Sequence, residues 1–103
     1  MVEAKSLVSQ LTLKDLKNTA KVFRAINHPL RLEIVRLIET NVSMNVTRIY
    51  IKLRIEQSVA SQHLAILREA EILNFKRDGK EIHYSVNQER IQILLDAIKI
   101  LKD

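Results

Sequence analysis

A single glycine and a single proline occur among the 103 residues of this chain. Because turns depend heavily on glycine and proline, their scarcity leaves little room for long loops. Hydrophobic residues make up 47% of the chain but aromatic residues only 4%, which is typical of a helical core built from Leu, Ile, Val and Ala. We therefore expect a mostly helical chain with short turns, forming one domain over residues 1–103.

Capping residues predict where three helices begin. Thr12 is an expected N-cap, with Asp15 three positions later as a weak capping-box partner. Pro29 is expected at the first position of a second helix, and Asn87 is expected to cap the last helix. Residues 2–11 either extend the first helix or form a separate short one. The expected inward-facing residues are Leu13, Leu16, Ala20 and Phe23, flanked by Val22 and Ile26, in the first helix, and Leu30, Ile34, Leu37 and Ile38 in the second.

Residues 57–70, QSVASQHLAILREA, sort into two faces when they are spaced at about 100° each. One face is apolar, and the other begins with amide and hydroxyl side chains instead of the Lys and Glu that dominate solvated helix faces. Amides and hydroxyls near a helix N-terminus can pair with base edges in the DNA major groove. The pattern therefore favours a DNA-reading helix over a merely solvated one. The apolar arc holds Val59, Ala60, Leu64, Ile66, Leu67 and Ala70, and the polar face holds Gln57, Ser58, Ser61, Gln62, Arg68 and Glu69.

An Asp-Gly pair at 78–79 predicts a β-hairpin formed by residues 73–77 and 80–86, because this dipeptide favours a two-residue turn. A last helix then follows to the end of the chain. Pairing across the turn is expected to set Phe75 opposite Ile82 and Leu73 opposite Tyr84 on one face, with Lys76, Glu81 and His83 on the other.

Residues 46–55 fit two patterns at once. Their apolar residues alternate as in a strand, but a subset of them also fits one face of a helix. Periodicity leaves both alternatives open in so short a run, and a turn at 54–56 is expected in either case. The strand pattern uses Ile49, Ile51, Leu53 and Ile55, and the helical pattern uses Val46, Ile49, Tyr50 and Leu53.

Three segments carry a resemblance to a known family. AINHPLRLEIVRLI (25–38) resembles the second-helix signature of ArsR/SmtB-type repressors, and IKLRIEQSVASQHLAILREAEIL (51–73) resembles their turn and recognition helix. FKRDGKEIHYSV (75–86) resembles their wing. The resemblance covers roughly residues 19–86. It implies a mainly α fold with a small β-hairpin wing, that is, a winged helix-turn-helix in the order α-α-α-α-β-β-α, and it implies that residues 46–55 are helical.

Two departures from the family pattern concern a turn and the metal sites. The family usually has Gly where this chain has Glu71, so the turn either needs no left-handed residue or tolerates strain. Metal-sensing members carry a Cys-x-Cys pair where this chain has Asn45 and Thr47, and others place Asp and His ligands in the last helix, which here has Asp96 and Asp103 but no His. Two isolated carboxylates cannot supply the nitrogen- or sulfur-rich shell that zinc or nickel prefers. We therefore expect no cofactor and no metal at the usual family sites.

The basic residues lie where the resemblance implies contact with DNA. A net charge of +5 is compatible with a nucleic-acid partner but does not prove one, and charges at a hairpin can simply be solvated. Helix 46–55 is expected to cross the DNA backbone and to touch phosphate through at least one of Arg48, Lys52 and Arg54. The expected DNA-binding residues are Arg48, Gln57, Ser58, Ser61, Gln62, Arg68, Lys76, Arg77 and Lys80.

The three histidines are expected to have structural roles. His63 lies in the middle of the apolar arc and is expected to be packed in the core and bonded to the backbone. His28 precedes Pro29 and is expected to be a helix-entry residue, and His83 is expected to be solvated on the outer face of the hairpin.

The last helix is apolar on two nearly opposite sides, so it must be buried on both. So small a chain has little else to cover it, which indicates a second copy; burial of the second face by the N-terminal helix of the same subunit is the open alternative. The resemblance likewise implies a homodimer through the first and last helices. Such a dimer would present two recognition helices to successive major grooves about 34–36 Å apart, on an inverted repeat. One face holds Ile91, Leu94, Leu95, Ile98 and Leu101, the other holds Ile93, Ala97 and Ile100, and the expected dimerisation residues are Leu16, Phe23, Ile91, Leu94, Leu95, Ile98 and Leu101.

Other function classes find little support. The chain has no Cys, which excludes disulfides, thiolate zinc sites and Cys nucleophiles. No run approaches the roughly 18 apolar residues of a membrane span, and the first 15 residues lack the apolar core of a signal peptide, so we expect a cytoplasmic protein without a membrane partner. A glycine-rich phosphate loop and a placeable nucleophile–base pair are both missing, which argues against an enzyme. We expect a homodimeric, sequence-specific DNA-binding regulator, most simply a repressor, that responds to an unknown inducer; the alternative is a winged-helix protein-interaction module that does not bind DNA.

Overall fold

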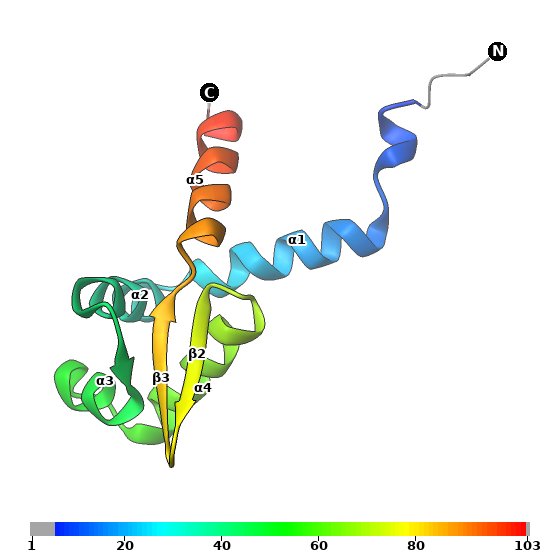
Figure 1. Ribbon diagram of the computed structural model, residues 1–103. Helices are drawn as coiled ribbons and strands as arrows, with labels where there is room; N and C mark the ends of the chain where they lie inside the picture. The colour runs from blue at the N-terminus through cyan, green and yellow to red at the C-terminus, as the bar shows by residue number, and fades with distance from the viewer. Residues whose placement is uncertain (1–5, 103) are drawn as a thin grey trace.

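The computed structural model describes residues 6–102 (Figure 1). Four helices lead to a β-hairpin and a fifth helix, which confirms the mainly helical, winged helix-turn-helix class. Residues 2–5, which belong to the predicted N-terminal helical segment 2–11, and Asp103, considered above as a possible metal ligand, lie outside the described residues. Within 6–102, no helix is both long and apolar enough to cross a membrane. The elements are η1 (Val8–Gln10), α1 (Leu13–Ile26), α2 (Pro29–Asn41), β1 (Met44–Asn45), α3 (Val46–Leu53), α4 (Gln57–Glu69), β2 (Leu73–Asp78), β3 (Glu81–Val86) and α5 (Gln88–Lys102).

The three predicted helix starts are confirmed. The Thr12 hydroxyl accepts a hydrogen bond from the Asp15 amide at 3.1 Å, which caps α1. Pro29 occupies the first turn of α2, where its missing N–H costs nothing. The Asn87 side-chain oxygen accepts from the Arg90 amide at 3.2 Å at the start of α5.

Residues 46–53 form helix α3, so the helical interpretation of that ambiguous segment is confirmed. The short strand β1 just before it was not expected. It pairs with β3 through Met44 and Tyr84, giving a three-stranded antiparallel sheet in the order β1-β3-β2. Two residues are too short a run for any sequence pattern, and the side chain of Met44 is 2% exposed and belongs to the core.

The hairpin β2–β3, called the wing from here on, has a register that differs from the expected one. Its two-residue turn is Gly79-Lys80, not Asp78-Gly79, and Gly79 takes up a φ of 63°. Glycine at the first turn position is what a type II′ turn requires. The shift moves each partner by two residues and therefore leaves the predicted faces unchanged. Phe75 pairs with Tyr84 instead of Ile82, and Leu73 with Val86 instead of Tyr84.

The core lies where α2, α3 and α4 pack against one another and against the sheet. The expected inward set of α2 is confirmed, because Ile34 and Ile38 are fully buried and Leu30 and Leu37 pack against the core. One member of the apolar arc of α4 was wrongly assigned, since Ile66 is 40% exposed. The largest fully buried side chains are Ile34, Ile38, Ile49, Leu64, Leu67 and Ile72.

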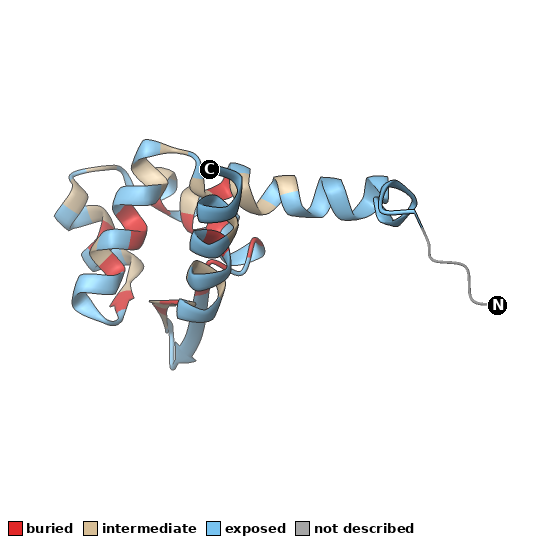
Figure 2. Cartoon of the chain, turned by 90° about the horizontal axis from the view of Figure 1, so that it is seen from above, coloured by how far each residue is buried: buried red, intermediate tan, exposed pale blue. Residues whose placement is uncertain are grey.

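Helices α1 and α5 project from this core (Figures 1 and 2). The radius of gyration is 16.9 Å, whereas a compact domain of about 100 residues has about 13 Å. Leu13 and Leu16, expected to face inward, are 67% and 51% exposed, because only the second half of α1 reaches the core. Helix α1 also fails to cover the second apolar face of α5, since Ile93 and Ile100 are 56% and 77% exposed. Within residues 6–102, that face is therefore left largely uncovered.

Candidate nucleic-acid interface

Helices α3 and α4 form a helix-turn-helix unit that presents the polar face of α4 to solvent. The turn between them contains Arg54 in a left-handed conformation with a φ of 56°. The Ile55 amide donates to the Tyr50 carbonyl at 3.1 Å, which closes the end of α3 and directs the chain into α4. The four expected base-reading residues at the start of α4 are all exposed: Gln57, Ser58, Ser61 and Gln62.

A groove of about 670 Å³ lies between the start of α3, helix α4 and the wing, and is called the wing groove here. It brings together three expected DNA-binding residues from separate elements, Ser61 and Arg68 of α4 and Lys80 of the wing turn. Thr47 of α3 also lines it, although no sequence pattern indicated that residue as a DNA contact. Arg68 and Lys80 can pair with an anionic backbone, and Ser61 and Thr47 can hydrogen-bond to it. The groove also contains two carboxylates, Glu69 and Glu81, which lie against Lys21 and His83.

Phe75 holds Arg68 against the wing. The guanidinium carbon of Arg68 lies 4.0 Å from the centre of the Phe75 ring, which is a cation–π contact. This contact explains why an aromatic residue on the wing can stay 46% exposed. The contact between Arg68 and Phe75 was not predicted, because the two residues lie on different elements. Only the packing of α4 on β2 brings them together.

The remaining expected residues lie outside the wing groove. Lys76 and Arg77 line a separate hollow of about 500 Å³ on the wing, next to Val42 and Ser43 of the loop that follows α2. Arg48 lies on α3, in a shallow hollow that it shares with Ile51 and Lys52. No one of these hollows contains all nine residues.

The structure corrects the expectation for His63. Its ring is partly buried, not in the core, and its Nδ1 atom lies 3.3 Å from Nη1 of Arg31 instead of bonding to the backbone. The ring of His28 lies 4.8 Å away, centre to centre. Burial lowers the pKa of His63, and the charges of His28 and Arg31 lower that pKa further. His63 thus joins α4 to Arg31 of α2, and its lowered pKa favours the neutral ring.

The other two histidines can be placed as well. His28 is a helix-entry residue, as expected, and its Nδ1 atom accepts from the Leu30 amide at 3.2 Å. His83 is partly buried, and its Nε2 atom lies 3.3 Å from Oε2 of Glu81 on the same strand, so it is less solvated than expected.

Glu71 does take up the left-handed conformation that a glycine would normally supply, with a φ of 59°. Its amide donates to the Arg68 carbonyl and the Ile72 amide donates to the Leu67 carbonyl, each at 3.0 Å. This pair of bonds is the Schellman motif, which places a left-handed residue at the position of Glu71. Of the two alternatives left open by the sequence, the turn thus follows the one in which strain is tolerated.

The positions of the family's Cys-x-Cys ligands hold residues with other roles. The Asn45 side-chain oxygen accepts from the Arg48 amide at 2.9 Å and caps α3, and Thr47 lines the wing groove. Among residues 6–102, no group of three or more His, Asp or Glu side chains is arranged to hold a metal ion.

Comparisons with known proteins agree on one family. Residues 28–74 match the family model of bacterial regulatory proteins of the arsR family. The transcriptional repressor PagR of Bacillus anthracis is 36% identical over 83 residues, which are 81% of this chain and 83% of PagR. The crystal structure of PagR superposes with a TM-score of 0.67 at 32% identity, covering 84% of this chain and 99% of PagR.

Two further solved structures share the fold along nearly the whole chain. NolR from Sinorhizobium fredii superposes with a TM-score of 0.71 at 25% identity, covering 97% of this chain and 96% of NolR. Mb0332 from Mycobacterium bovis, a homodimeric winged helix-turn-helix DNA-binding domain, superposes with a TM-score of 0.72 at 21% identity, covering 100% of this chain and 91% of the fragment.

Proposed function

Because this chain belongs to the arsR family, whose members are transcriptional regulators and not enzymes, we propose that it binds DNA in a sequence-specific manner and acts as a repressor that blocks promoter access. The observation that carries this proposal is the row of exposed amides and hydroxyls at the start of α4, beside a wing groove in which Arg68 and Lys80 lie together with Glu69 and Glu81. Repression, as opposed to activation, is supported by the similarity to the transcriptional repressor PagR.

The proposed DNA-binding residues form two groups, one that contacts bases and one that contacts phosphates. Gln57, Ser58, Ser61 and Gln62 lie at the start of α4, the part of a recognition helix that contacts base edges, and read the sequence. Cations pair with phosphates, which supply affinity and orientation without sequence preference. The phosphate contacts come from Arg48 on α3, Arg68 on α4 and Lys76, Arg77 and Lys80 on the wing.

The repressor acts as a homodimer on an inverted-repeat operator. One chain exposes 8041 Å², whereas a compact 12.0-kDa monomer exposes roughly 6,000 Å². The excess exceeds the roughly 800 Å² that each partner buries in a standard interface. Helices α1 and α5 are mostly exposed (Figure 2), and Mb0332, with the same fold, is homodimeric.

The expected dimerisation residues fall into two groups. Leu16, Leu95, Ile98 and Leu101 are 45–80% exposed and are available to a second copy. Phe23, Ile91 and Leu94 already pack against the core of their own chain, so they support the interface from beneath.

The regulator does not respond to metal at the usual family sites, because amide and hydroxyl side chains replace the thiolates there and one of them already caps α3. Whatever releases it from DNA acts elsewhere. An excess of Zn²⁺ or Ni²⁺ is therefore expected to leave the DNA affinity unchanged, as measured by fluorescence anisotropy. A marked loss of affinity on metal addition would contradict this part of the proposal.

Selection of bound duplexes from a random DNA pool tests the function directly. The expected result is an imperfect inverted repeat, and titrations against the selected and a random duplex are expected to show affinities that fall with salt. Failure to enrich any sequence, together with no salt-dependent binding, would refute DNA recognition and favour a protein-interaction module.

A further inference from the structure

Two acidic residues tie the C-terminal end of α4 to the two projecting helices. Glu69, in the last turn of α4, forms an ion pair with Lys21 of α1. Glu71, two residues later, forms an ion pair with Arg90 of α5. Both helices proposed for dimerisation are therefore joined to the same end of the recognition helix.

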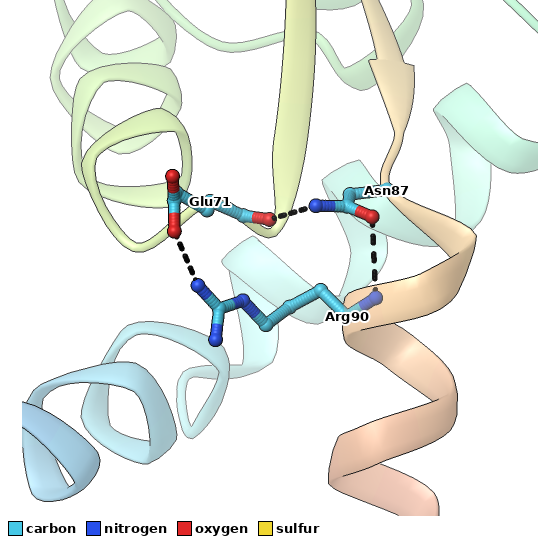
Figure 3. Close-up of polar contacts among 3 residues, drawn as sticks. All are labelled: Glu71, Asn87 and Arg90. Carbon is cyan, nitrogen blue, oxygen red and sulfur yellow. Dashed lines mark hydrogen bonds and ion pairs between the residues drawn. The ribbon is translucent and has the colours of Figure 1, made fainter.

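The Glu71 contact belongs to a closed set of interactions with two residues at the start of α5 (Figure 3). The Asn87 side-chain amide donates to the Glu71 carbonyl at 2.9 Å, and the Asn87 side-chain oxygen accepts from the Arg90 amide at 3.2 Å. The Arg90 guanidinium donates a hydrogen bond to the Glu71 carboxylate. We call Glu71, Asn87 and Arg90 the α4–α5 junction.

The junction joins α4 and α5 at more than one point, and this limits how they can rotate. The Asn87 backbone amide donates to the Ile72 carbonyl at 2.9 Å, beside the bond from the Asn87 side chain to the Glu71 carbonyl. Both bonds come from one residue, so they form one point of attachment about which α5 can still rotate. The Arg90–Glu71 pair adds a second point of attachment, one helical turn further along α5. A glycine at position 71 would suit the backbone but would provide no side chain for this second point.

We propose that the α4–α5 junction sets the angle between the recognition helix and the dimerisation helix, and so determines the half-site spacing that the dimer accepts. Glu71, Asn87 and Arg90 are positioning residues, and none of them needs to touch DNA. This inference rests on the proposed DNA-binding dimer and adds a specificity that the polar face of α4 cannot supply. In a dimer, a small rotation at each junction changes the separation of the two recognition helices.

The junction is expected to affect spacing far more than folding. The Glu71 and Arg90 side chains are 70% and 28% exposed, and ion pairs this close to solvent contribute little to stability. Loss of the pair should therefore leave a folded protein whose two recognition helices are less strictly placed.

The test compares Arg90→Gln and Glu71→Gly with the wild-type protein on two kinds of duplex. One kind carries a single selected half-site, and the other carries two half-sites at the selected spacing or with one or two base pairs added or removed. We expect half-site affinity to stay within about twofold of wild type and affinity at the selected spacing to fall by about fivefold, because DNA binding must then fix the angle between α4 and α5 in both subunits, which the ion pairs fix beforehand in the wild type. The preference for the selected spacing should weaken accordingly.

Two further variants control for charge and for geometry. Lys99→Gln removes one positive charge from an exposed position on the same helix and should keep the wild-type spacing preference. The exchanged pair Glu71→Arg with Arg90→Glu should restore that preference. Circular dichroism and thermal midpoints confirm that each variant folds.

The outcomes separate the inference from the proposed function. Wild-type spacing preference in Arg90→Gln would overturn the inference, and so would an equal loss of affinity on half-sites and on every spacing, since that indicates a direct phosphate contact. A wild-type protein that binds none of the duplexes would instead refute the proposed function itself.

Discussion

Three residues other than glycine have positive φ values at helix ends in the described part of the chain. Arg54 is in the left-handed helical region, whereas Val42, with a ψ of −51°, is the centre of a γ-turn in which the Ser43 amide donates to the Asn41 carbonyl at 2.7 Å. Val42, Arg54 and Glu71 have φ values of 68°, 56° and 59°. Such a conformation costs an L-residue about 1–2 kcal/mol. At Arg54 and Glu71 this conformation allows backbone hydrogen bonds that close the end of the preceding helix. These bonds offset the conformational strain.

Val42 is the least suited of the three, because it is β-branched. Its side chain is 76% exposed, so little packing is lost when it is removed, and glycine adopts a positive φ without steric cost. We expect Val42→Gly to stabilise the protein by about 1 kcal/mol and to raise Tm by roughly 4–8 °C. Calorimetry at equal protein concentration measures the shift, with Val42→Ala as a control that keeps the Cβ atom. A Tm at or below that of wild type would contradict the assignment of strain to this residue.

Acidification is expected to weaken the fold through His63. Its pKa is lowered by burial and then by His28 and Arg31, so the unfolded chain takes up the proton first. The stabilising contribution of neutral His63 is therefore complete above a pH of about 6.5, the ordinary pKa, and is lost as the pH falls through that value toward the lower folded-state pKa. Urea midpoints at about pH 7.5 and about pH 5.5 test this. Replacement of His63 by Gln should reduce the loss, and an unchanged loss would assign the effect to other groups.

At the scale of elements, α4 and the wing present different chemistry to DNA. We expect Arg77→Ala, on the wing, to weaken binding to all sequences and to reduce the salt slope by about one unit. Gln62→Ala, on the exposed face of α4, should mainly reduce discrimination between the selected and a random duplex. Anisotropy titrations of both duplexes over a range of salt concentrations separate the two effects. If both variants bind as wild type does, the assignment of these elements to DNA is wrong.

At the scale of the whole molecule, the exposed apolar faces of the projecting helices α1 and α5 predict an obligate homodimer. We expect Ile98→Glu to convert the dimer into a monomer, because a charge at the centre of an apolar interface is costly to bury. Sedimentation analysis measures the mass of the particle. Ile51→Glu, at a similarly exposed apolar position on α3, is the matched control and should leave the mass of the wild-type dimer unchanged. A wild-type protein that sediments as a monomer would disprove the pairing.

Local signals were enough to predict most of the elements. Thr12, Pro29 and Asn87 mark helix starts because capping depends on one side chain and its near neighbours. The faces of α2 and of the wing were also predicted, since both follow from the periodicity of apolar residues. The wing register was not, because the choice between two adjacent two-residue turns depends on how Tyr84 and Val86 pack.

The sequence by itself determined the order of helices, the hairpin, the polar face of α4 and the absence of thiolate ligands, because each depends on residue type and short spacing. Only the tertiary structure decided how those parts meet: Arg68 on Phe75, His63 against Arg31, and the left-handed Glu71 held by Arg90. These contacts join residues on different elements, and no local pattern encodes the distance between elements. The scarcity of glycine predicts short turns, and the structure shows that three of those turns place a positive φ on a residue other than glycine.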